Sequence, residues 1–168
     1  QIENKMRGDS YLFRRWIKEG YVFATPGETV DYSFMFQKII EDAKIYDVQE
    51  IAYDRNLAAH LIQDLSDVFT CVEFSQSITG MSEPSKAWEQ LIADGKLIDN
   101  TPVMDWMVSC ATVKPDANGN IKPIKPDVNK STKRIDGVIT SIMANNRLEV
   151  ALADEEAHGN FKIEDAIF

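Results

Sequence analysis

A short apolar segment at residues 48–54 lies between two stretches of helical periodicity and ends on a carboxylate, Asp54. Such a segment is typical of a buried β-strand. Ligands of open α/β sheets bind at the carboxyl ends of the strands, so we expect Asp54 at the edge of a site and Ile51 and Ala52 in the core. The alternative is that Asp54 is an N-cap or turn residue that opens the next helix.

Helix and strand patterns alternate around this segment. Apolar residues with a period of 3.6 predict amphipathic helices at 9–20, 31–43 and 57–65, and short apolar runs predict further strands at 21–23 and 69–74. The β-α-β order of residues 48–74 predicts a sheet that is at least partly parallel. The polar loop Ser75-Gln76-Ser77 would then lie at the same sheet edge as Asp54, and it is a candidate for substrate contact.

The second half of the chain is predicted to be mainly helical. Ser82 with Pro84 and Thr101 with Pro102 are typical helix starts, and Gly95 is a typical helix end. The Met and Trp side chains of these two helices fit a core better than a cofactor site. Residues 113–125 predict a hairpin around an Asn-Gly turn, and a last long helix begins at Asp136.

The charge of the chain is unevenly distributed. The 168 residues carry a net charge of -9, which argues against nonspecific binding of nucleic acid by the whole surface. Between residues 114 and 134, however, six positive and two negative charges give +4, so the rest of the chain carries -13. This segment predicts a strip that faces phosphates, the alternative being a solvated hairpin; its basic residues are Lys114, Lys122, Lys125, Lys130, Lys133 and Arg134.

Asp136 is a second candidate acid, because it stands at a helix start where the helix dipole favours negative charge. Gly137 beside it would leave room for a metal ion or a backbone to approach. Two aspartates from separate elements, next to a basic strip, fit oxygen ligation of Mg²⁺ or Mn²⁺ and hydrolysis of a phosphodiester by two metal ions. Such a site normally takes more than two carboxylates, and no third one is evident.

Other kinds of site find little support in the sequence. Cys71 and Cys110 lie in apolar patterns without metal-ligand spacing, and His60 and His158 are isolated. No apolar run approaches the length of a membrane span, and the N-terminus lacks the apolar region of a signal peptide. A Gly-x-x-x-x-Gly-Lys-Ser/Thr phosphate loop is also absent, so we do not expect ATP hydrolysis by this chain.

Eight short motifs, taken in order, resemble the nuclease domain of the terminase large subunit of tailed bacteriophages and prophages. The resemblance extends from about residue 9 to about residue 145, and its specificity comes from the order and spacing of the motifs. They are Trp16…Gly20, Thr25-Pro26-Gly27, Tyr53-Asp54, Phe74-Ser75-Gln76, Ser82-x-Pro84-x-Lys86, Pro102-Val103-x-x-Trp106, Asp116-x-Asn118-Gly119-Asn120 and Ile135-Asp136-Gly137.

The resemblance implies an α/β fold of the RNase H-like type, a mixed sheet flanked by helices, and a Mg²⁺- or Mn²⁺-dependent endonuclease that cuts concatemeric viral DNA in the bacterial cytoplasm. Asp54 and Asp136 would be its second and third acidic metal ligands. The double-stranded DNA would contact Gln76 and the basic residues Lys122, Lys125, Lys130, Lys133 and Arg134. A portal protein, a terminase small subunit and an upstream ATPase domain are the partners that the family implies.

The resemblance fails at the N-terminus. The first metal-binding aspartate of the family precedes the Trp16 region, and nothing in residues 1–8 matches it, so we expect a truncated nuclease domain at 1–153 and an acidic tail at 154–168, with weak or no cleavage by this chain alone. Two rival functions are another RNase H-like nuclease, such as a resolvase or transposase core, and a docking module for DNA or portal without catalytic activity.

Overall fold

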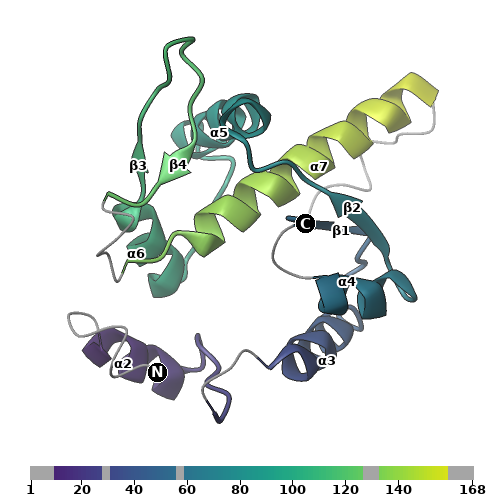
Figure 1. The fold of residues 1–168 in the computed structure, drawn as a ribbon, viewed down its shortest axis with the longest axis vertical. Coiled ribbons are helices and arrows are strands. Elements are labelled where there is room, and N and C mark those ends of the chain that lie inside the picture. The colour runs from purple at the N-terminus through teal and green to yellow at the C-terminus, as the bar shows by residue number, and fades with distance from the viewer. Residues whose placement is uncertain (1–9, 28–30, 56–58, 127–132, 159–168) are drawn as a thin grey trace.

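The computed structural model describes residues 10–27, 31–55, 59–126 and 133–158 (Figure 1). Its elements in chain order are α2 (Ser10–Glu19), α3 (Tyr32–Asp42), β1 (Glu50–Tyr53), α4 (Ala59–Ser66), β2 (Thr70–Glu73), α5 (Ile78–Ala93), α6 (Pro102–Cys110), β3 (Thr112–Val113), β4 (Pro123–Ile124) and α7 (Asp136–His158). Within these ranges, no helix combines the length and the apolar character needed to cross a bilayer.

The predicted β-α-β unit is confirmed. β1 and β2 pair in parallel, with Glu50 opposite Thr70 and Tyr53 opposite Glu73, and α4 forms the crossover. Figure 1 shows α7 on one side of this small sheet and α4 with α3 on the other. The buried Leu61 and Leu65 of α4 supply the apolar side chains of that second layer.

The predicted hairpin is also confirmed, although it does not join the first sheet. β3 and β4 pair antiparallel, and Gly119 adopts a φ of 77°, which the turn requires. The described residues therefore form two separate two-stranded sheets instead of the single mixed sheet that we expected. The hairpin lies against α5, where the Ser82 hydroxyl accepts a hydrogen bond from the Ile121 N–H at 3.2 Å.

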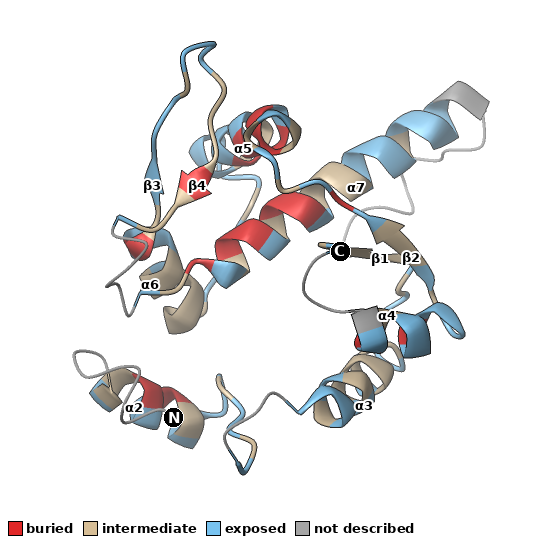
Figure 2. Ribbon diagram, viewed as in Figure 1, coloured by how far each residue is buried: buried red, intermediate tan, exposed pale blue. Residues whose placement is uncertain are grey.

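The main core surrounds the first half of α7. Figure 2 shows that this half is buried, whereas the second half is largely exposed. The buried side chains come from α5, α6, α7 and the segments next to them: Phe74, Met81, Trp88, Cys110, Ile135, Val138, Ile139, Ile142 and Met143. A smaller cluster joins α2 to α6, because Phe13 and Trp16 pack edge-on against Trp106 with ring centroids 5.5 Å apart.

Two predicted boundaries are wrong. Residues 21–23 form no strand, because the Tyr21 N–H bonds the Trp16 carbonyl at 2.9 Å and so belongs to the C-terminal cap of α2. Helix α5 begins at Ile78 and not at Ser82, because the Ser77 side chain caps it by accepting from the Gly80 N–H. Pro84 lies inside this helix, and its missing N–H leaves the Gly80 carbonyl without the usual helical partner.

Helix α7 is longer than we expected. Asp154, Glu155 and Glu156, which open the predicted acidic tail, continue the helix to His158. Residues 159–168 and residues 1–9, where the first acidic ligand was sought, lie outside the described residues. The division into a nuclease domain at 1–153 and a tail therefore stays a prediction.

Candidate functional site

Asp54 directly follows β1 and is half-buried at the carboxyl edge of the parallel sheet, as predicted. It lines a cavity of about 450 Å³. The strand ends contribute Asp54, Arg55, Glu73 and Phe74 to this cavity, the loop before α5 contributes Ser75, Gln76 and Ser77, and the hairpin contributes Lys122. The cavity therefore combines two acidic side chains, two basic side chains, an amide and hydroxyl groups at one edge of the sheet.

The loop before α5 is held tightly against that helix. The Ser75 hydroxyl donates to the Ser77 hydroxyl at 3.0 Å, and the Ser77 hydroxyl accepts from the Gly80 N–H at the same distance. A Cβ atom at Gly80 would stand 2.6 Å from the Ser75 carbonyl oxygen, so only glycine permits this approach. The backbone at Gly80 thus fixes the polar side chains of the loop at the cavity.

Lys122 and Gln76, two of the residues that we expected to contact DNA, are brought together. The half-buried Lys122 ammonium donates to the Gln76 carbonyl oxygen, which ties the hairpin to the edge of the sheet. The Gln76 side-chain amide in turn donates to the Met143 sulfur at 3.5 Å. Three elements that are distant in sequence, the loop after β2, the hairpin and α7, therefore meet beside Asp54.

Arg55 and Glu73 also line the cavity, although neither was predicted as a site residue. The Arg55 Nε lies 3.7 Å from a Glu73 carboxylate oxygen, and both side chains are well exposed. A signal was present, because Arg55 follows Asp54 directly and Glu73 ends the next predicted strand. Parallel pairing places the ends of both strands at one edge of the sheet, and the register brings Glu73 opposite Tyr53.

Asp136 is the first residue of α7 and is exposed, as expected for an acid at a helix start. It does not line the cavity of Asp54. Met143, which Gln76 contacts, follows Asp136 by seven residues, so the two positions lie about 10 Å apart along the helix axis. Asp136 therefore lies two helical turns beyond the point where α7 meets the loop beside the cavity.

The space beside Gly137 is occupied by α6. A Cβ atom at this position would lie 2.8 Å from the Met107 sulfur and 3.3 Å from the Met104 sulfur. The Gly137 N–H points at the Met107 sulfur at 3.1 Å. The prediction that this glycine makes room for a metal ion or a backbone is therefore wrong, and close packing of α7 on α6 explains it instead.

The fit to a metal ion is partial. The carboxylates of Asp54 and Asp136 are the hard oxygen donors that Mg²⁺ and Mn²⁺ prefer. Within the described ranges, however, no group of three or more His, Cys, Asp or Glu side chains is arranged to hold a metal ion. The described residues thus supply suitable donors but no complete coordination site.

The remaining candidate DNA contacts lie along the path from the hairpin to α7. Lys125 follows β4 and is half-buried, Lys133 is exposed, and Arg134 donates to the Lys133 carbonyl oxygen at 3.1 Å just before α7 begins. Lys130 lies outside the described residues. Of the described basic residues, Lys122 thus lies at the cavity of Asp54, and Lys133 and Arg134 lie just before α7, where Asp136 stands.

Comparisons with known proteins identify the family that the chain resembles. Residues 2–152 match the family model described as "Terminase large subunit, endonuclease domain". Over 147 residues the chain is 31% identical to the terminase large subunit of Enterobacteria phage HK97, covering 85% of this chain and 29% of that protein. Protein YmfN of Escherichia coli (strain K12) is also 31% identical over 147 residues, covering 86% of this chain and 32% of that protein.

A solved structure gives the same result. The crystal structure of the HK97 bacteriophage large terminase superposes with a TM-score of 0.73 and 31% sequence identity, covering 84% of this chain and 30% of that one. The chain thus spans less than a third of the length of the HK97 protein that it matches.

Proposed function

The chain belongs to the endonuclease-domain family of terminase large subunits, and we propose that it supplies the metal-dependent DNA-cutting site of a packaging terminase. The observation that carries this proposal is the position of Asp54 in a polar cavity at the carboxyl edge of a parallel sheet, beside Gln76 and Lys122. Ligands of α/β sheets bind at this edge.

Asp54 and Asp136 are the residues that we assign to Mg²⁺ or Mn²⁺. Because the described residues contain no group of three such ligands, we propose that a further acid from outside them joins Asp54 and Asp136 at a two-metal site. An RNase H-like arrangement, completed by an acid upstream of Trp16, would meet this need. We assign the DNA backbone to Lys122, Lys125, Lys130, Lys133 and Arg134, whose charges offset the acidic remainder of the chain.

The biological role follows from the family and forms part of the same proposal. The protein would cut concatemeric viral DNA during genome packaging, in the cytoplasm of the bacterial host. A portal protein and a terminase small subunit would be its partners, and an ATPase domain would act in the same chain.

The test compares charge-removing variants of the full-length protein on plasmid DNA in the presence of Mn²⁺. Asp54→Asn and Asp136→Asn should each lower the cleavage rate by at least about a hundredfold, because an amide keeps the shape of the carboxylate but not its charge. Asp64→Asn, on the exposed side of α4, is the matched control and should cut like the unaltered protein.

Two outcomes would contradict the proposal. Cleavage that is unchanged in both variants would leave only a docking role for this domain. Cleavage confined to branched DNA junctions, with linear and plasmid DNA left intact, would favour a resolvase over a terminase.

A further inference from the structure

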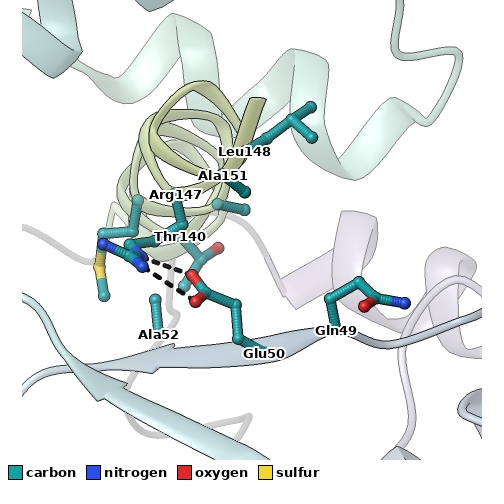
Figure 3. A pocket seen from close by; sticks show the side chains of 9 residues that line it. Gln49, Glu50, Ala52, Thr140, Arg147, Leu148 and Ala151 are labelled. Carbon is teal, nitrogen blue, oxygen red and sulfur yellow. Dashed lines mark hydrogen bonds and ion pairs between the residues drawn. The ribbon is translucent and has the colours of Figure 1, made fainter. Parts of the chain in front are cut away.

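An ion pair joins β1 to α7 at the end of the strand that lies away from Asp54 (Figure 3). Arg147 Nη2 donates to Glu50 Oε2 at 2.9 Å, and Arg147 Nε donates to Glu50 Oε1. The side chains are only 26% and 21% exposed. A bidentate contact between a guanidinium and a carboxylate fixes orientation as well as distance, so the pair constrains how β1 lies on α7.

The strand carries this constraint toward Asp54. Side chains of a strand alternate between its faces, so Glu50 and Ala52 share a face, and the next position on that face is Asp54. Ala52 lines a cavity of about 360 Å³ together with Glu50, Met143 and Arg147, as Figure 3 shows in part. The face of β1 that leads to Asp54 is therefore the face that α7 covers.

The helix carries the same constraint toward Asp136. Asp136, Thr140, Met143 and Arg147 are spaced by four, three and four residues, which places them on one face of a helix. The last three of them line the cavity between β1 and α7. Asp136 begins this row of residues.

The chain directions of β1 and α7 are opposite where the two elements pack against each other. Glu50, at the start of β1, meets Arg147, whereas Gln76, beyond the end of the parallel strand β2, meets the earlier helix residue Met143. Measured from the pair, Asp54 lies about 13 Å along the strand. Asp136 lies about 16 Å along the helix. Asp54 and Asp136 therefore lie at the same end of the packed pair of β1 and α7. The ion pair of Glu50 and Arg147 holds the pair together at the other end.

We propose that Glu50 and Arg147 are positioning residues, which hold β1 and α7 so that Asp54 and Asp136 face one metal-binding edge. The inference rests on the proposed function, because it assigns the pair a role in metal binding through those two acids. Hydrogen bonds from Arg147 lower the pKa of Glu50, and hydrogen bonds to Glu50 raise the pKa of Arg147, so both groups stay charged at neutral pH.

The experiment measures Mn²⁺ binding by the full-length protein, through the electron paramagnetic resonance signal of the free ion. Glu50→Gln and Arg147→Gln should each weaken Mn²⁺ binding about tenfold, as changes behind the direct ligands of a metal do. The double variant should bind no more weakly than either single one, because both substitutions break the same contact. In cleavage assays at saturating Mn²⁺, the KM for plasmid DNA should stay within about twofold of the unaltered value.

Two controls separate positioning from general loss of stability. Arg15→Gln breaks the exposed 2.8 Å pair with Glu19 on α2, and it should leave Mn²⁺ binding unchanged. Ile62→Ala removes a half-buried side chain from α4; it should lower the melting temperature without changing Mn²⁺ binding.

The outcomes distinguish this inference from the proposed function. If Asp54→Asn and Asp136→Asn weaken Mn²⁺ binding but the Glu50 and Arg147 variants only lower the melting temperature, the positioning role is overturned and the proposed function stands. Additive effects in the double variant would also overturn the positioning role. Mn²⁺ binding that is insensitive to Asp54 and Asp136 would overturn both.

Discussion

Glu50 links the charge state of one carboxylate to the stability of the fold. Hydrogen bonds and charge from Arg147 lower its pKa, although burial acts in the opposite direction. A carboxylate whose pKa is lower in the folded than in the unfolded protein, where it is about 4.3, adds stability above that value. This contribution is lost as the pH falls through the pKa of the folded state.

We therefore expect Glu50→Gln to destabilise the domain at neutral pH by about 1.5 to 3 kcal/mol, the usual range for hydrogen bonds to charged groups. The difference from the unaltered protein should stay constant above about pH 4.3, the pKa of the unfolded state, and should shrink as the pH falls from there through the lower pKa of the folded state, where Glu50 itself becomes neutral. Melting temperatures measured across this interval check the prediction. Glu19→Gln, which removes an exposed pair with Arg15, should change the melting temperature less at every pH.

The same residues show what the sequence reveals about a site and what it does not. Asp54 and Asp136 could be located because a strand end and a helix start are set by neighbouring residues. The partner of Glu50 could not be found in this way, because Arg147 lies 97 positions further along the chain. Gly137 was misinterpreted for a similar reason, since Met107, which fills the space beside it, belongs to another helix.

Helix α5 and its preceding loop form the element on which the site depends most directly. Replacing glycine by alanine inside a helix normally adds about 1 kcal/mol of stability. At Gly80, however, the added Cβ would stand 2.6 Å from the backbone carbonyl of Ser75, which cannot move without its loop. We expect Gly80→Ala to lower stability by about 1 to 3 kcal/mol, as overpacking does.

Gly137→Ala is the matched control for this prediction, because its added Cβ meets side-chain atoms of the flexible Met104 and Met107 and not the backbone carbonyl of a loop. We expect its stability to stay within about 1 kcal/mol of the unaltered protein, since the gain in helix propensity offsets the repacking. Melting temperatures compare the two variants, and amide hydrogen exchange should be faster at residues 75–80 in Gly80→Ala alone. Equal stability of both variants would show that the loop can move the Ser75 carbonyl away from the added Cβ at little cost in free energy.

Local capping signals decided which elements were predictable. Thr101 followed by Pro102 marked the start of α6 correctly, and the Thr101 hydroxyl accepts from the Met104 N–H. Ser82 and Pro84 resemble such a start but lie inside α5, because Ser77 provides the cap one turn earlier. The helical periodicity of apolar residues was enough to predict that α5 exists. Its first residue could not be predicted, because two capping signals, at Ser77 and at Ser82, compete and only the fold decides between them.

The arrangement of the sheets was beyond the reach of sequence patterns. The β-α-β unit was predicted because its strands are neighbours in sequence and its crossover is short. Where the hairpin lies depends on contacts such as that of Ile121 with Ser82 and that of Lys122 with Gln76, which join residues 39 and 46 positions apart. These contacts hold the hairpin at α5 and at the cavity, and they keep it out of the parallel sheet.

The charge distribution of the folded chain gives the last prediction. Outside residues 114–134 the chain carries -13, so DNA is repelled except along the basic segment. Each phosphate contact releases counterions and adds about 0.9 to the slope of log K against log salt concentration. The double variant Lys125→Gln/Lys133→Gln should therefore bind duplex DNA more weakly, with a slope reduced by about 1.8, for all sequences alike.

Fluorescence anisotropy with a labelled duplex at several salt concentrations measures this slope. Lys44→Gln removes a single lysine charge from an exposed position after α3, far in sequence from the basic segment, and serves as the control. If net charge alone acted on binding, each variant would lower the slope in proportion to the charge that it removes. The double variant would then lower the slope about twice as much as Lys44→Gln does. A reduced slope in the double variant with no change in the control would instead assign the phosphate contacts to the segment that leads from Asp54 to Asp136.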